Sequence, residues 1–392
     1  MLGETPHEPQ AHALLGLCLA RQEKFGDAQA EVEQAIALAP DWAYAHYCRS
    51  VVLADRRQFA EAERSAREAV RLDPADADNY ARVAATLFNQ GKWRDAYDAA
   101  MEGLAHDGEH GACGNLRSMA LTKLGRPEDA LASVDESLAR RPDDAMAHAN
   151  KGWALLHQST PQPALVHFRE ALRLDPTLEY AKHGMVEALK ARNPIYRWML
   201  AYFLWMGRLS DRARWGVILG GWFGARILRN AAEANPSLEP WLTPILIVYL
   251  AFVLLTWFAV PLFNLLLRVS RFGRHALSRD QRASSNWFGL CLVVFAASVA
   301  AAFYTDSATA FVVAVVALGM ALPLTTVYHC DPGWPRQMMT LFAGALAAVG
   351  AAAVAGEALE QQWMSPAFGL FLLGVIASPW LANYLAGVTV RR

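Results

Sequence analysis

Apolar and small side chains recur along the first half of the chain with a fixed period of 34 residues. A leucine and an alanine nine residues after it mark each period. They stand at Leu19, Leu53, Leu87, Leu121 and Leu155, and at Ala28, Ala62, Ala96, Ala130 and Ala164. A third position is always small, at Gly16, Ser50, Ala84, Ser118 and Gly152. A period of this length predicts pairs of helices that stack into a solenoid.

The packing of two helices explains these choices. The alanine is expected where the second helix crosses the first, because only a small side chain lets two helix axes approach to about 8–10 Å. The leucine is expected to face the opposing helix. Prolines in the same phase end the second helix, since proline lacks an amide proton and its ring clashes with the preceding turn. They stand at Pro40, Pro74, Pro142 and Pro176. Around Gly108, Gly111 and Gly114 the proline is missing, which predicts a soft joint.

These spacings resemble the tetratricopeptide repeat. The resemblance covers five repeats, at 9–42, 43–76, 77–110, 111–144 and 145–178. It implies an all-α solenoid of helical hairpins over residues 1–192, with a capping helix after the last repeat.

Long apolar stretches dominate the second half of the chain. They lie at 241–267, 287–304, 308–328, 338–356 and 367–388. Each reaches or approaches the roughly 20 residues that cross a hydrocarbon core. A soluble domain does not contain five such stretches separated by short loops, so the pattern predicts a bundle of transmembrane helices over residues 241–392.

Residues 193–240 are harder to assign. The stretch 195–206 is aromatic and too short to span a membrane, and 215–225 offers only about 16 Å of uncharged helix. Gly216, Gly220 and Gly224 form a face that permits close helix contact in a bilayer. We therefore expect an amphipathic or first membrane segment here: residues 210–230 either cross the membrane as a first span or lie on its surface.

Charge is distributed unevenly between the two halves. Residues 1–194 hold 22 Lys and Arg against 29 Asp and Glu, whereas the remainder holds 14 against 8 and has no lysine. The loop 268–286 carries five arginines and one aspartate, which predicts a cytoplasmic location. The chain begins with polar residues rather than an apolar signal sequence, which favours a cytosolic repeat domain. We expect a multi-pass protein of a bacterial inner membrane, with the repeats in the cytosol.

The sequence matches the known motifs for catalysis or metal binding only poorly. His7 and His12 lack the spacing of a zinc-binding helix, and the five cysteines show no metal-ligand spacing. Nucleotide loops and nucleophile elbows are absent from the sequence. The acidic soluble half disfavours nucleic acid as a partner. We therefore expect no enzyme, cofactor, metal or small-molecule substrate.

The family resemblance implies where a partner binds. In tetratricopeptide proteins the first helix of each repeat lines a concave face that holds a peptide or a partner helix. Carried onto this chain, the binding positions are Tyr44, Tyr47, Arg82, Asn89, Asn115, Lys123, Asn150, Trp153 and His157. Asparagines can bind a peptide backbone, and aromatic side chains supply rigid contact area. The alternative is that these side chains only decorate a solvated face.

The sequence thus predicts an adaptor or scaffold that binds proteins at the cytosolic face of the membrane in which it is anchored. The alternative is a regulatory or accessory subunit of a membrane transporter or membrane enzyme, in which the repeats sense a partner. Few polar residues lie inside the apolar stretches, and a transport path would need more of them.

Overall fold

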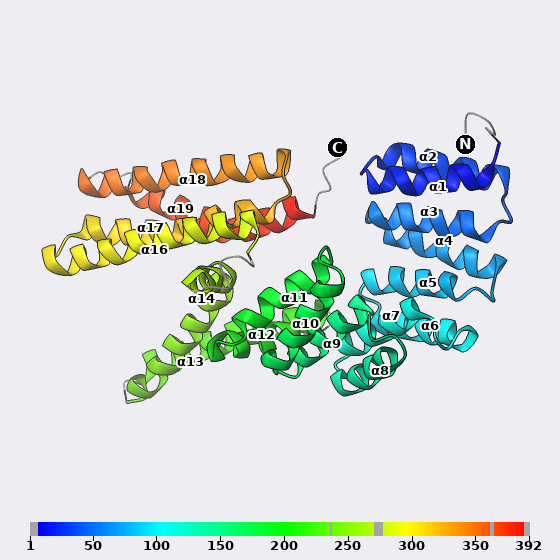
Figure 1. Ribbon diagram of the computed structural model, residues 1–392. Helices are drawn as coiled ribbons and strands as arrows, with labels where there is room; N and C mark the ends of the chain where they lie inside the picture. Colours follow the sequence, from blue (N-terminus) through cyan, green and yellow to red (C-terminus); the bar gives the residue numbers. More distant parts are fainter. Residues whose placement is uncertain (1–6, 210, 236, 270–276, 361–363, 388–392) are drawn as a thin grey trace. The chain divides into compact units, whose positions relative to one another are not determined.

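The computed structural model describes residues 7–209, 211–235, 237–269, 277–360 and 364–387, which form helices joined by turns (Figure 1). None of these residues lies in a β-strand. The chain divides into two compact units, Met1–Ser210 and Asp211–Arg391. The first unit therefore extends past residue 192, where the sequence pattern ends the repeat domain.

Five helical hairpins build most of the first unit. They are α1 (Pro9–Arg21) with α2 (Phe25–Leu38), α3 (Ala43–Asp55) with α4 (Phe59–Leu72), α5 (Ala77–Asn89) with α6 (Trp93–His106), α7 (Gly111–Lys123) with α8 (Pro127–Arg140), and α9 (Ala145–His157) with α10 (Pro161–Leu174). Each hairpin packs on the next (Figure 1). These bounds place one hairpin in each of the five expected repeats.

The turn inside each hairpin has the same geometry. Its second residue after the first helix adopts a positive φ of 59° to 79° at Glu23, Arg57, Gly91, Gly125 and Ser159. The following amide donates back to the carbonyl of the periodic leucine, as Lys92 does to Leu87 at 3.0 Å. This is the Schellman pattern, in which a left-handed residue ends a helix and satisfies its last carbonyls. Only two of the five positions are glycine, the residue that adopts this conformation without strain.

The core of the solenoid follows the predicted phase. The alanine of every repeat, from Ala28 to Ala164, is completely buried. The small residue at the other crossing point is buried in all five repeats as well. At Gly152 an added Cβ would lie 2.7 Å from the Phe168 ring, well inside normal contact distance. The small residues are therefore required by the closeness of the helices.

Two further helices complete the first unit, α11 (Glu179–Lys190) and α12 (Pro194–Met206). The helix α11 packs on α9 and α10 in the place expected for a capping helix. Glu187 and Lys190 form a buried ion pair at 3.0 Å, and the hydroxyl of Tyr196 on α12 donates to the Glu187 carboxylate. This polar contact fastens the start of α12 to the end of the solenoid.

The second unit contains long helices. They are α13 (Asp211–Ala234), α14 (Glu239–Val269), α16 (Arg279–Thr305), α17 (Ala308–Thr326), α18 (Trp334–Ala358) and α19 (Met364–Ala386), with a short 3-10 turn over Val327–His329. Within the described residues five of them are long and apolar enough to cross a membrane, namely α14 and α16 to α19. Their bounds enclose or overlap the five apolar stretches of the sequence. The predicted end at residue 388 lies outside the described residues.

Close packing and polar contacts hold these helices together. Phe371 of α19 is fully buried against Gly319 of α17 and Gly350 of α18, where an added Cβ would approach the ring to about 3 Å. At one end of the bundle Arg336 of α18 donates two hydrogen bonds to the carboxylate of Asp280 on α16, at 2.7 and 3.2 Å. The second unit is thus a packed bundle and not a set of separate hairpins.

The helix α13 is not among the five apolar helices. It is 24 residues long and carries arginines at 212, 214, 226 and 229. Nothing lies within 4 Å of an added Cβ at Gly216, Gly220 or Gly224. Whether α13 crosses the membrane or lies on it therefore stays a prediction.

Candidate functional site

The predicted binding residues lie on the first helices of repeats two to five, and the surface begins with an aromatic cluster on α3. The ring centroids of Trp42 and Tyr44 are 5.4 Å apart, and Tyr44 stacks on Tyr47 at 5.7 Å and 8° between ring planes. Tyr44 is 38 % exposed. Burial, reinforced by the neighbouring Cys48, raises the pKa of Tyr44 to about 12, so the phenol is neutral at physiological pH. The family pattern does not predict Trp42 as a binding residue, because Trp42 precedes the first helical position.

Arg82 of α5 lies beside this cluster. Its Nε donates to Ser50 Oγ of α3 at 3.1 Å. Burial lowers the pKa of Arg82, and the nearby Tyr47 and Asp55 oppose this shift. Burial likewise raises the pKa of Asp55, and the positive charges of Arg82 and Arg21 oppose this shift. A cation and an anion are thus both partly desolvated on the α1–α3–α5 side, and such groups gain most from a charged or hydrogen-bonding partner.

The three predicted asparagines have different surroundings. Asn89 at the end of α5 is exposed. Asn115 donates to Asp144 Oδ2 at 3.2 Å and accepts from Asn150 Nδ2 at 3.1 Å. Asn150 is only 2 % exposed. Asn115 and Asn150 therefore link α7 to α9 through their side chains, and Asn89 is the most exposed of the three.

The predicted residues of the last repeats contact later parts of the same unit. Trp153 donates from Nε1 to the carbonyl of Tyr180 at 3.3 Å and stacks on His183 at 5.7 Å, both on α11. His157 Nδ1 lies 2.7 Å from the guanidinium of Arg208, which follows α12. The chain after the repeats thus occupies part of the predicted surface.

His157 and Lys123 are electrostatically unusual. Burial, with help from Arg208 and Lys123, lowers the pKa of His157 to about 3, so its Nδ1 is an unprotonated acceptor for the guanidinium. Burial and Arg208 also lower the pKa of Lys123, whose Nζ lies 5.8 Å from the centre of the Trp93 ring. This end of the predicted surface is organised around Arg208, a residue that the repeat pattern does not include.

The predicted surface therefore has two parts. The part on α3 and α5, formed by Tyr44, Tyr47, Arg82 and Asn89, presents aromatic, cationic and amide groups; we refer to it as the α3–α5 surface. The part on α7 and α9 is engaged with α11 and with Arg208. The first part has the chemistry of a protein-binding surface, since tyrosine and arginine are enriched at interface hot spots.

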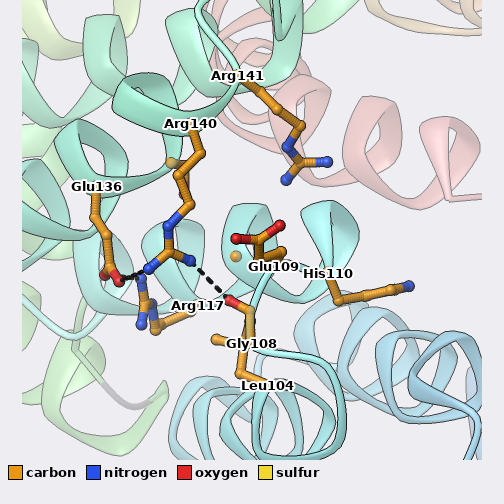
Figure 2. A pocket seen from close by; sticks show the side chains of 10 residues that line it. Leu104, Gly108, Glu109, His110, Arg117, Glu136, Arg140 and Arg141 are labelled. Carbon is orange, nitrogen blue, oxygen red and sulfur yellow. Dashed lines mark hydrogen bonds and ion pairs between the residues drawn. The ribbon is translucent and has the colours of Figure 1, made fainter.

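A separate cleft lies where the sequence predicts a soft joint (Figure 2). Arg140 bridges it, donating to the carbonyl of Gly108 at 2.9 Å and to Glu136 at 2.9 Å. An added Cβ at Gly111 would lie 2.0 Å from the Arg141 guanidinium, so that glycine makes room for the arginine. The cavity measures about 20 Å³, enough for one water molecule and too little for an organic ligand.

The described residues contain no group of three His, Cys, Asp or Glu side chains placed to hold an ion. In the bundle of the second unit Asn264 of α14 is a buried polar side chain, only 1 % exposed. Its Oδ1 has no hydrogen-bond partner among the described residues.

Comparison with known proteins identifies the repeats. A family model described as "Tetratricopeptide repeat" matches residues 13–77 and 116–179. No curated protein matches in sequence.

Solved structures of repeat proteins resemble about half of the chain. One is TTC0263, a thermophilic TPR protein of Thermus thermophilus, which is 17 % identical, with 46 % of this chain and 98 % of that chain covered and a TM-score of 0.42. Another is YrrB, a TPR protein with an unusual peptide-binding site, at 18 % identity, 46 % and 94 % coverage and a TM-score of 0.34. A third is pilF of Pseudomonas aeruginosa, at 16 % identity, 50 % and 88 % coverage and a TM-score of 0.41.

Proposed function

We propose that the chain is a membrane-anchored adaptor, because it carries tetratricopeptide repeats, which mediate protein–protein interactions, and because its described residues include five helices apolar enough to span a membrane. Its α3–α5 surface binds a protein or peptide partner, and its second unit anchors the repeats in a bacterial inner membrane. The arginine-rich loop 268–286 supports a cytosolic position for the repeats. The proposal assigns it no catalytic step and no cofactor.

The observation that carries this proposal is the stack of Tyr44 on Tyr47 beside Arg82. Two parallel aromatic rings next to a partly desolvated guanidinium offer a partner stacking area, cation–π contact and charge-assisted hydrogen bonds in one place.

Site-directed photocrosslinking in cells tests the binding surface. A photoreactive phenylalanine replaces Tyr44 in the full-length protein, and Met101 on α6 serves as the matched control because the two side chains are about equally exposed, at 38 % and 39 %. The proposal expects a discrete crosslinked adduct from position 44 that is absent from position 101. The same adducts from both positions, or none from position 44, would contradict it.

Cysteine labelling with a reagent that cannot cross membranes tests the anchoring. Cys18 is exposed, and Ser278 and Ser237 provide exposed positions for introduced cysteines. If α13 spans the membrane and the repeats are cytosolic, intact cells label Ser237→Cys and leave Cys18 and Ser278→Cys unlabelled. Opposite labelling of Cys18 and Ser278→Cys would place α13 on the membrane surface.

The alternative function, an accessory subunit of a transporter or membrane enzyme, is favoured by one observation. The buried Oδ1 of Asn264 has no partner within the described residues, and polar groups inside membrane bundles are costly and often functional. The variant Asn264→Leu distinguishes the two functions. An adaptor keeps its partner binding in this variant, whereas an accessory subunit loses transport or enzymatic activity of its complex.

A further inference from the structure

The helix α12 has two different apolar faces. One face is buried and consists of Tyr196, Met199, Leu200 and Met206. The helix is held at both ends, because Tyr196 bonds to Glu187 near its start and Arg208 bonds to His157 just after its end. Its orientation relative to the repeats is therefore fixed.

The other face is aromatic and exposed. Trp198 and Trp205 are 61 % and 45 % exposed, and Tyr202 and Ala201 lie between them. Because 198, 202 and 205 are spaced by four and three residues, the rings form one stripe along the helix. Tyr202 lies against Trp205, with ring centroids 6.2 Å apart. We call Trp198, Ala201, Tyr202 and Trp205 the aromatic stripe. Contiguous apolar surface of this kind marks an interaction site.

Charge and length identify the occupant. Residues 188–210 contain four Lys or Arg and no Asp or Glu, and Arg192 and Arg197 are exposed. The helix has 13 residues, about 20 Å, which is too short to cross a hydrocarbon core of about 30 Å. Tryptophan and tyrosine prefer the membrane–water interface, and arginines beside them attract anionic headgroups.

We propose that α12 lies in the headgroup region of the bilayer, with the aromatic stripe toward the acyl chains, and docks the end of the solenoid on the membrane surface. This inference rests on the proposed membrane anchoring, because the apolar helix α14 follows in the same chain and brings α12 to a bilayer. The buried face of α12 is turned toward the protein, while the opposite face contacts lipid. Docking in this way restricts the orientations of the repeats at the membrane.

Fluorescence quenching in lipid nanodiscs tests the proposal on the full-length protein. A dye sensitive to its environment is attached at Ala201→Cys, in the stripe, in a Cys18→Ser background because the other four cysteines are buried. Ala139→Cys on α8 is the matched control, an exposed alanine on a helix of the solenoid. Leu250→Cys on α14 reports insertion of the bundle, since Leu250 is exposed in the middle of a candidate span. The quenchers are lipids with a nitroxide near the headgroup or deep in the acyl chain, and aqueous iodide.

The proposal expects the dye at 201 to be quenched more strongly by the shallow nitroxide than by the deep one, and the dye at 139 by iodide alone. Trp198→Ser with Trp205→Ser should reduce the lipid quenching at 201. If the dye at 250 is quenched by lipid and the dye at 201 is reached only by iodide, or by no quencher because protein covers it, α12 does not contact lipid although the anchoring stands. Absence of lipid quenching at 250 would overturn the anchoring as well.

Discussion

The packing of Phe168 against two glycines makes the sharpest prediction about the solenoid. Phe168 of α10 is fully buried and meets Trp153 edge-on at 5.8 Å between centroids. An added Cβ at Gly152 would lie 2.7 Å from the ring, and one at Gly184 would lie 2.2 Å from it. Carbon atoms normally pack at about 3.5–4.0 Å, so the ring or a helix must move by about 1 Å or more.

The net effect follows from two opposing terms. Overpacking a filled core costs about 1–3 kcal/mol, whereas alanine in a helix interior is favoured over glycine by about 1 kcal/mol. We therefore expect Gly152→Ala to destabilise the packing of α9 on α10 by about 1 kcal/mol. Gly184→Ala, with its closer approach, should destabilise the packing of α11 on α10 by more. Gly26→Ala on α2 is the matched control, because nothing lies within 4 Å of its added Cβ, and it should be neutral or stabilising.

Hydrogen–deuterium exchange of the full-length protein is the appropriate assay, since a chain of two units need not unfold in one step. Peptides from α9 and α10 should exchange faster in Gly152→Ala than in the unmodified protein. Their exchange rates should not change in Gly26→Ala. Adding Phe168→Leu should cancel part of the effect, because the shorter side chain makes room for the methyl group. Equal effects of Gly152→Ala and Gly26→Ala on the exchange rates would contradict the close approach of α9 to α10.

Three further predictions follow from single contacts. Ser159→Gly should raise the melting temperature of the first unit, because Ser159 holds a φ of 59° that costs serine about 1 kcal/mol and glycine nothing. The first unit should lose stability as the pH falls from 6.5 toward 3, because folding lowers the pKa of His157 to about 3 and protonation removes the acceptor for Arg208. Between pH 7.5 and pH 4 the melting temperature should therefore fall less in His157→Gln than in the unmodified protein. Arg140→Ala should speed amide exchange around Gly108, because it removes the bond that braces this turn.

The repeat architecture could be predicted from the sequence because each position of the period has one physical role. An alanine such as Ala96 is fully buried in the structure, at the helix crossing where the pattern places it. The turns inside the hairpins could be predicted less well from the sequence. The left-handed position is occupied by Glu23, Arg57 and Ser159 as well as by glycine, and these residues give no local signal for a positive φ.

The surroundings of the predicted binding residues could be predicted only in part. The family pattern describes each first helix as if it stood alone, so it could not reveal that Trp153 and His157 are engaged by α11 and Arg208. The same limit applies to α12. Its aromatic sequence suits a membrane segment, but Tyr196 and Met199 are buried and Tyr196 bonds to Glu187 of α11, which only the three-dimensional structure reveals.

The most direct test of the central claim is the affinity of the full-length protein for the partner captured at position 44. The double variant Tyr44→Ala with Tyr47→Ala removes the stacked rings, and Met101→Ala is the control on α6. The account predicts a loss of affinity of about tenfold or more in the double variant, as for hot-spot aromatics, with unchanged binding in Met101→Ala and similar melting temperatures for both. Equal affinity of the double variant and the unmodified protein would contradict the claim that the α3–α5 surface binds the partner.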